Sequence, residues 1–153
     1  MVILYIAAMV GANLSIAHFG PWVSPINAFF LIGLDLTLRD KLHDKWNGSL
    51  LKMAALILSA SALSYIINPA TGMIALASFV AFAISAALDW VVYTKLKGKP
   101  YMTRVNGSNV IGAAADSLLF PSLAFGAFLP LIVLGQFTAK VGGGYLWALI
   151  LRK

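Results

Sequence analysis

The sequence contains no cysteine and no glutamate, and charged residues make up only 10% of its 153 positions. The absence of cysteine excludes disulfides and every metal or redox site that depends on thiolates. The two histidines, His18 and His43, are far apart in the sequence and make a poor metal-ligand set. We therefore expect no metal and no cofactor. No basic stretch precedes the first hydrophobic residues, so a cleaved signal peptide is not expected either.

Hydrophobic residues are abundant instead, at 61% of the sequence. Soluble domains carry about 25% charged residues, so this composition predicts an all-α membrane protein with one transmembrane domain over residues 1–153. The hydrophobic segments predict a bundle of six transmembrane helices, at about 2–18, 24–38, 50–67, 73–94, 109–127 and 130–150. A spanning helix needs about 20 residues, so the second segment is short for one.

The basic residues gather in two of the predicted loops, 39–49 and 95–108, and in Arg152 and Lys153 at the end of the chain. Three other connections carry no charge: 19–23, 68–72 and 127–130. Lys and Arg are enriched in cytoplasmic loops. This pattern predicts an inner-membrane protein with both basic loops and both termini in the cytoplasm. It also argues against nucleic acid as the reason for the net charge of +6.

Apart from Lys52, which belongs with the basic loop at the start of the third segment, four charged residues fall inside the predicted helices: Asp35, Asp89, Asp116 and Lys140. A charge at the bilayer centre costs about 2.5–3.5 kcal/mol, so such residues need partners and are functional candidates. Asp116 and Lys140 each lie 12 positions from a bend near Phe128. Adjacent antiparallel helices would place them at the same depth, which predicts a buried ion pair. Gln136 lies one turn before Lys140 on the same helix face.

The two other aspartates have different sequence neighbours. Asp35 has Arg39 four positions later, which predicts an ion pair within one helix. Asp89 has no cation at three or four positions, so it needs a partner on another helix, a water or a ligand. The adjacent Trp90 and Tyr93 could stack on a planar ligand, but we favour a role as anchors at the membrane interface.

Small residues form a stripe before each of two aspartates, at a spacing of four residues. The stripes are Ala77, Ala81, Ser85 and Asp89 in one helix, and Ser108, Gly112 and Asp116 in the next. Small residues allow close approach of a ligand or of another helix, so the stripes predict either a cavity between these helices or plain helix packing. Three glycines at 142–144 follow Lys140 and suggest a hinge or a close helix crossing.

Four stretches resemble the queuosine precursor transporter family, also called the vitamin uptake transporter family. They are LDLTLR at 34–39, LDWVVY at 88–93, SNVIG at 108–112 with Asp116 and Ser117, and Gly135-Gln136 with Lys140. The resemblance covers about residues 24–145, and 108–117 is its most specific part. It implies a six-helix inner-membrane protein that imports 7-deazaguanine precursors such as preQ0 or preQ1. The connection between the first two helices is shorter than the family pattern.

The leading hypothesis is therefore a carrier for a 7-deazaguanine-like solute, with the site between the fourth, fifth and sixth predicted helices. The candidate solute-binding residues are Asp35, Asp89, Ser108, Asn109, Asp116, Gln136 and Lys140. No nucleophile–base triad, P-loop or HExxH motif is present, so we do not expect an enzyme. Two alternatives stay open: a non-transporting protein such as a pore-former or assembly subunit, and a substrate-binding subunit of an ATP-driven importer. The expected partners are the solute and the lipid bilayer, without nucleic acid, and a homo-oligomer is left open.

Overall fold

The computed structural model describes residues 1–151, and Arg152 and Lys153 lie outside the described residues. The described chain is helical almost throughout, which confirms the predicted all-α fold class. Its elements are α1 (Val2–Phe19), η1 (Pro21–Val23), α2 (Ser24–Asn27), η2 (Ala28–Ile32), α3 (Gly33–Lys45), α4 (Leu50–Ile67), η3 (Pro69–Thr71), α5 (Gly72–Lys95), α6 (Tyr101–Phe125) and α7 (Pro130–Leu151). η1 and η3 are 3-10 turns, whereas η2 is a π-helical stretch that joins α2 to α3 without a break.

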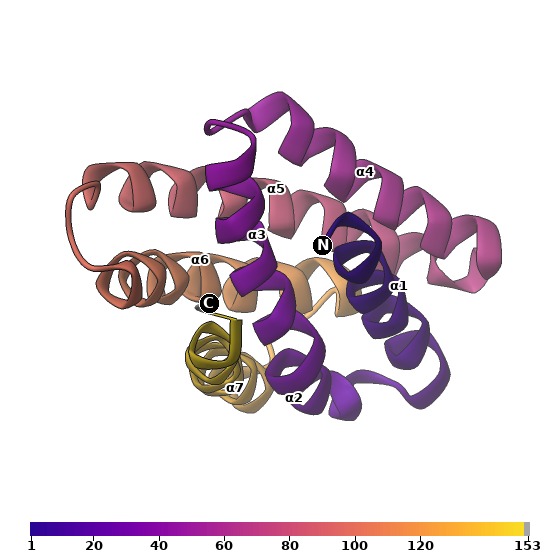
Figure 1. Ribbon diagram of the computed structural model, residues 1–153. Helices are drawn as coiled ribbons and strands as arrows, with labels where there is room; N and C mark the ends of the chain where they lie inside the picture. Colours follow the sequence, from indigo (N-terminus) through magenta and orange to yellow (C-terminus); the bar gives the residue numbers. More distant parts are fainter. Residues whose placement is uncertain (152–153) are drawn as a thin grey trace.

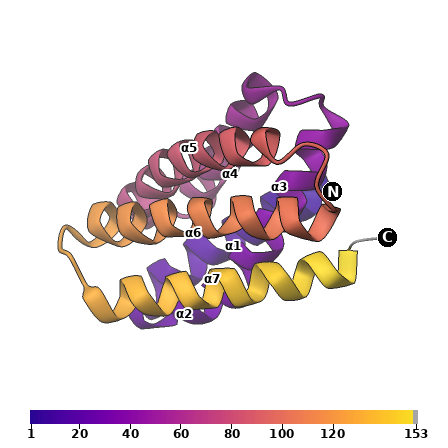
Figure 2. The same ribbon diagram turned by 90° about the vertical axis from the view of Figure 1, so that its left-hand side faces the viewer.

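The helices α5, α6 and α7 pack against one another in chain order (Figure 1). The helices α1 and α3 share one hydrophobic core with α5 and α6. Figure 2 shows the N-terminus, the end of α7 and the α5–α6 connection at one end of the molecule. The bend between α6 and α7 lies at the other end. The N-terminus, the end of α7 and the α5–α6 connection thus lie at the same end of the molecule, as the positions of the basic residues predicted. Which end faces the cytoplasm stays a prediction.

Four helical stretches are long and apolar enough to cross a membrane: Val2–Phe19, Pro21–Lys45, Leu50–Ile67 and Pro69–Lys95. Large apolar side chains such as Ile3 and Leu51 are more than 80% exposed, as expected for a surface that faces lipid. α6 and α7 are also long enough, but Asp116, Gln136 and Lys140 make their sequences more polar. The predicted total of six spans therefore stays a prediction.

Two predicted loops are mostly helical. The second helix does not end at residue 38 but continues as α3 to Lys45, because its charged residues Arg39 and Asp40 are buried inside the bundle. Only 46–49 of the predicted loop 39–49 is non-helical. Only 96–100 of the predicted loop 95–108 is non-helical, because α6 begins directly after Pro100. Proline favours the start of a helix, and this signal outweighs the polarity of residues 101–108.

Candidate functional site

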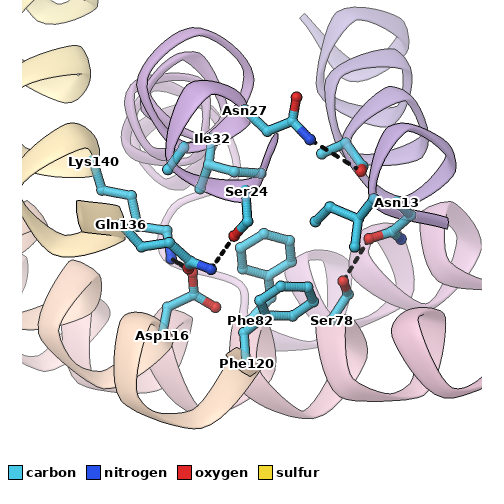
Figure 3. Close-up of a pocket in the computed structure, with 13 residues that line it drawn as sticks. Asn13, Ser24, Asn27, Ile32, Ser78, Phe82, Asp116, Phe120, Gln136 and Lys140 are labelled. Carbon is cyan, nitrogen blue, oxygen red and sulfur yellow. Dashed lines mark hydrogen bonds and ion pairs between the residues drawn. The ribbon is translucent and has the colours of Figure 1, made fainter. Parts of the chain in front are cut away.

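A buried cavity lies between α1, the α2–η2 stretch, α5, α6 and α7 (Figure 3). Every residue that lines it is buried. Its volume is about 20 Å³. A cavity needs about 10–15 Å³ to hold one water, so this conformation has room for a water but not for a bicyclic ligand.

One wall of the cavity carries the predicted ion pair. The Lys140 ammonium lies 2.6 Å from Asp116 Oδ2, and both side chains are at most 3% exposed. The contact and its burial confirm the prediction that was made from the spacing around the α6–α7 bend. Lys140 also donates to Gln136 Oε1 at 2.6 Å and to Ser117 Oγ at 3.2 Å. Gln136 in turn donates to Ser24 Oγ of α2, which ties α7 to the short helix (Figure 3).

The opposite wall is polar but carries no charge. Ser78 of α5 donates to the Asn13 side-chain oxygen at 2.6 Å, and Asn13 donates to Ser64 Oγ of α4 at 3.1 Å. The aromatic rings of Phe82 and Phe120 lie between the two walls (Figure 3). The cavity thus offers a carboxylate, an ammonium group and several neutral hydrogen-bonding groups around two apolar rings.

A second buried ion pair lies deeper in the bundle, away from the cavity lining. Arg39 Nε of α3 is 3.7 Å from Asp89 Oδ2 of α5, and both side chains are at most 3% exposed. Arg39 also donates to Ser85 Oγ at 3.2 Å. The predicted partner of Arg39 was Asp35, and that prediction is wrong, because Asp89 on α5 takes the guanidinium instead. The expectation that Asp89 needs a partner from another helix is confirmed.

The two small-residue stripes pack against each other and leave no cavity between them. Ser85 Oγ donates to the Gly112 carbonyl at 2.9 Å. A Cβ at Gly112 would lie 2.9 Å from Arg39 Nη2 and 3.4 Å from Asp89 Cβ. The prediction of a cavity between these stripes is therefore wrong, and the alternative of close helix packing holds. The cavity opens on another side of Asp116, toward α7 and the α2–η2 stretch.

The structure places the seven predicted site residues in two neighbouring groups. Asp116, Gln136 and Lys140 line the cavity. Asp35, Asp89, Ser108 and Asn109 are also buried but do not line it. Ser108 Oγ donates to the Val105 carbonyl, whereas both amide atoms of Asn109 lack a hydrogen-bond partner among the described residues.

The three glycines of α7 form a close helix crossing and not a hinge. α7 continues unbroken through them. A Cβ at Gly143 would lie 2.1 Å from the Phe29 carbonyl oxygen of η2, and one at Gly33 would lie 2.6 Å from the Gly143 carbonyl carbon. The crossing holds the α2–η2 stretch directly against α7 and so brings Ser24 within reach of Gln136.

The end of the bundle near the basic loops holds a separate, open pocket of about 300 Å³ lined by Trp90 and Arg104, among others. Trp90 donates to the Gly48 carbonyl at 3.0 Å, and buried Tyr93 donates to Asp44 Oδ2 at 2.8 Å. Trp90 thus links the loop after α3 to α5, and Tyr93 links the end of α3 to α5. Tyr93 is fully buried and the Arg104 guanidinium lies over its ring, so it offers no free aromatic face for a ligand. An anchoring role at the membrane interface stays a prediction for Trp90, and burial argues against it for Tyr93.

Sequence reasoning missed four buried residues of this region: Tyr5, Ser24, Arg39 and Asp40. Arg39 and Asp40 were assigned to a loop because charges usually end a membrane segment. The missing signal was available in α3, where Leu36, Leu38 and Leu42 continue the hydrophobic pattern past residue 38. Ser24 and Tyr5 carry no local signal, because only the packing of distant helices brings them to the polar groups.

Residues 26–151 match the model of the family described as "Putative vitamin uptake transporter". The matched range covers most of the chain and includes both buried ion pairs. No curated protein and no solved structure matches the chain.

Proposed function

The chain belongs to this family of vitamin uptake transporters, and we propose that it imports a planar, 7-deazaguanine-like solute across the cell inner membrane. The observation that carries the proposal is the buried Asp116–Lys140 pair in the wall of a buried polar cavity. Charged side chains inside a membrane domain are rare and mark the pathways of solutes and ions.

The chemistry of the cavity suits this class of solute. A 7-deazaguanine ring presents a ring N–H and an amine side by side, and one carboxylate can accept hydrogen bonds from both. Asp116 Oδ1 has no hydrogen-bond partner among the described residues, while Oδ2 is held by Lys140. In this proposal the solute takes the carboxylate, and Lys140 and Gln136 turn to the ring carbonyl. Phe82 and Phe120 supply apolar faces for the rings.

The remaining predicted residues fit a route from the cavity toward the basic loops. Asn109 lies about two turns before Asp116 in α6, on the side of the α5–α6 connection. Ser108, Asp89 and Asp35 lie with it in the buried polar group beside the cavity. We propose that the solute meets Asp116, Gln136 and Lys140 first and these four residues on its way inward.

The cavity must widen before a solute can enter. Ligand pockets for drug-sized molecules hold about 300–1,000 Å³, far more than the buried cavity offers. The α2–η2 stretch is the wall best suited to move, because η2 is π-helical and π-helical turns frequently occur at functional sites. The conformation described here would then be the closed, empty carrier.

Reconstitution of the purified chain alone into liposomes, with radiolabelled 7-cyano-7-deazaguanine outside, tests the proposal. A carrier takes up the label without any other protein. A substrate-binding subunit of an ATP-driven importer would instead bind the label, with a rise in its melting temperature, but would not move it. Neither binding nor uptake would refute the proposed solute class.

Asp116→Asn tests the site within the same assay. Truncating one partner of a buried charged hydrogen bond costs about 2–5 kcal/mol, so uptake should fall more than about tenfold. Asp44→Asn is the matched control, because Asp44 is exposed and lies outside the cavity. An analogue without the ring amine should be a poor solute for the wild type, and the preference should shrink in Asp116→Asn. Equal uptake of both solutes by the wild type would show that no carboxylate binds this edge.

A further inference from the structure

The buried charges of the described chain do not balance. Four aspartates are at most 2% exposed: Asp35, Asp40, Asp89 and Asp116. Only two cationic side chains, Arg39 and Lys140, are buried with them in residues 1–151. Lys140 pairs with Asp116 and Arg39 pairs with Asp89. Two buried carboxyl groups, those of Asp35 and Asp40, are therefore left without an ion pair in the part of the chain that the structure describes.

Asp35 is the more informative of these two groups because of its neighbours. It is fully buried, and neither of its carboxyl oxygens has a hydrogen-bond partner among the described residues. The charged and titratable groups that act on it come from four helices: Tyr5 of α1, Arg39 of α3 itself, Asp116 of α6 and Lys140 of α7. Asp35 thus interacts electrostatically with members of both the cavity pair and the Arg39–Asp89 pair.

Tyr5 supplies a second, independent sign of a site. Its side chain is fully buried, and its hydroxyl interacts electrostatically with the Asp35 carboxyl. No atom pair between the two side chains meets the geometry of a hydrogen bond, and the hydroxyl has no other partner within residues 1–151. Two buried polar groups from different helices therefore lack hydrogen-bond partners among the described residues, and burial of each is costly, most of all for a carboxyl group that carries a charge.

A bound proton explains this arrangement better than a bound metal ion. An ionised carboxylate without any partner is too costly to bury, and such a group takes up a proton instead. A metal ion would need several oxygen ligands, and no group of three or more Asp, Glu, His or Cys residues in the described chain is arranged to hold one. The neighbouring Lys140 and Arg39 would also repel a second cation.

We propose that Asp35 is a proton-binding site of the closed conformation, and that its proton is released to water when the cavity opens and Asp35 becomes hydrated. The step is a simple dissociation: the carboxyl O–H bond breaks, the electron pair stays on the carboxylate, and water accepts the proton. Closing reverses it. The proton thereby links the open and closed forms to pH, and a rise in pH favours the open form. The importance of this link for transport rests on the proposed function, whereas proton binding at Asp35 does not.

Infrared spectroscopy of the purified protein tests proton binding without any solute. An exposed aspartate is ionised at about pH 7, whereas a proton-bearing Asp35 contributes a protonated-carboxyl band there. Asp35→Asn should remove one carboxyl's share of this band, and Asp44→Asn, at an exposed and ion-paired position, should leave it unchanged. If Asp35→Asn leaves the band intact, Asp35 is ionised and the proposal is wrong.

Cysteine accessibility tests the link to opening, because the native chain has no cysteine. Ser78→Cys places one thiol in the cavity wall, and Lys99→Cys in the exposed α5–α6 connection corrects for the effect of pH on the thiol itself. The corrected labelling rate of Ser78→Cys should rise by about tenfold per pH unit over the titration range, the slope for loss of one proton. Adding Asp35→Asn should make this rate independent of pH.

Tyr5→Phe provides a second test of the link between Asp35 and opening in case Asp35→Asn fails to fold. It retains the buried ring but removes the hydroxyl, which would stabilise the ionised carboxylate by donating to it. The rise in labelling of Ser78→Cys should therefore move to higher pH. A labelling rate that does not depend on pH, or one that Tyr5→Phe leaves unchanged, would refute the link between Asp35 and opening.

Discussion

Removing one member of the Asp116–Lys140 pair should cost more than removing both, and the two single variants should not be equivalent. After Lys140→Met, Asp116 keeps no partner, because its other oxygen is already without one among the described residues. After Asp116→Asn, Lys140 still donates to Gln136 and Ser117, and the new amide oxygen lies in the place of the carboxylate. Breaking a buried ion pair costs about 3–5 kcal/mol. Lys140→Met should lie at the upper end of this range and Asp116→Asn at or below the lower end.

The double variant has no buried charge left at this position. It leaves two buried amides, the one introduced by Asp116→Asn and that of Gln136, with unmet hydrogen bonds, at a cost of about 1–3 kcal/mol. Since Lys140→Met alone should cost about 5 kcal/mol, more than the double variant, the cycle predicts strong coupling between the two positions.

Unfolding of the purified protein in mixed micelles, followed by tryptophan fluorescence, measures these differences. The Asp44–Arg104 pair supplies the control cycle: its atoms are 3.3 Å apart, but the Asp44 side chain is 48% exposed. Exposed pairs contribute about 0–1 kcal/mol, so coupling there should be small. If both single variants at Asp116 and Lys140 are as stable as the wild type, or if the cycle shows no coupling, the buried contact is not an ion pair.

Two further predictions concern the helix crossing and the membrane orientation. Gly143→Ala should destabilise the protein strongly, because its Cβ would lie 2.1 Å from the Phe29 carbonyl oxygen. Gly142→Ala should fold normally, because its Cβ would lie 3.6 Å from the Phe29 ring. Equal thermal stability of the two variants would contradict the close crossing. Single cysteines at Ser49 and Gly98 should resist impermeant thiol reagents added outside intact cells, and labelling of either one would reverse the predicted orientation.

The sequence predicts contacts well where the chain itself limits the geometry. Asp116 and Lys140 lie on consecutive helices joined by a short bend, so equal distances from that bend place them together. The connection at 68–72 was likewise predicted from the sequence, and Asn68 accepts a hydrogen bond from the Ala70 backbone there. Local chemistry and one short connection fix both features, so no knowledge of the remaining helices was needed.

Contacts between helices that are distant in the sequence follow a different logic. Arg39 had an acidic neighbour within its own helix, and sequence spacing favoured that ion pair. The structure pairs it with Asp89, because Gly112 leaves room for the guanidinium beside α6 and Ser85 accepts a hydrogen bond from it. The spacing of residues along one helix identifies only the ion-pair partners within that helix. It gives no information on partners that other helices of the bundle supply.

Contacts between distant helices also explain why the sequence alone did not indicate the excess of buried aspartates over buried cations. With Arg39 and Asp40 assigned to a loop, three buried aspartates faced one lysine and one nearby arginine, and Asp35 had an obvious partner. Burial of α3 as far as Leu42 adds Asp40 to the buried acids, and Asp89 takes Arg39 away from Asp35. Asp35, for which sequence spacing offered Arg39 as a partner, is therefore a buried acid without an ion pair among the described residues. It interacts electrostatically with both members of the cavity pair, Asp116 and Lys140. To identify functional candidates in a membrane bundle, one therefore needs to know which partner each buried charge contacts in the folded structure. The partners that sequence spacing suggests are not sufficient.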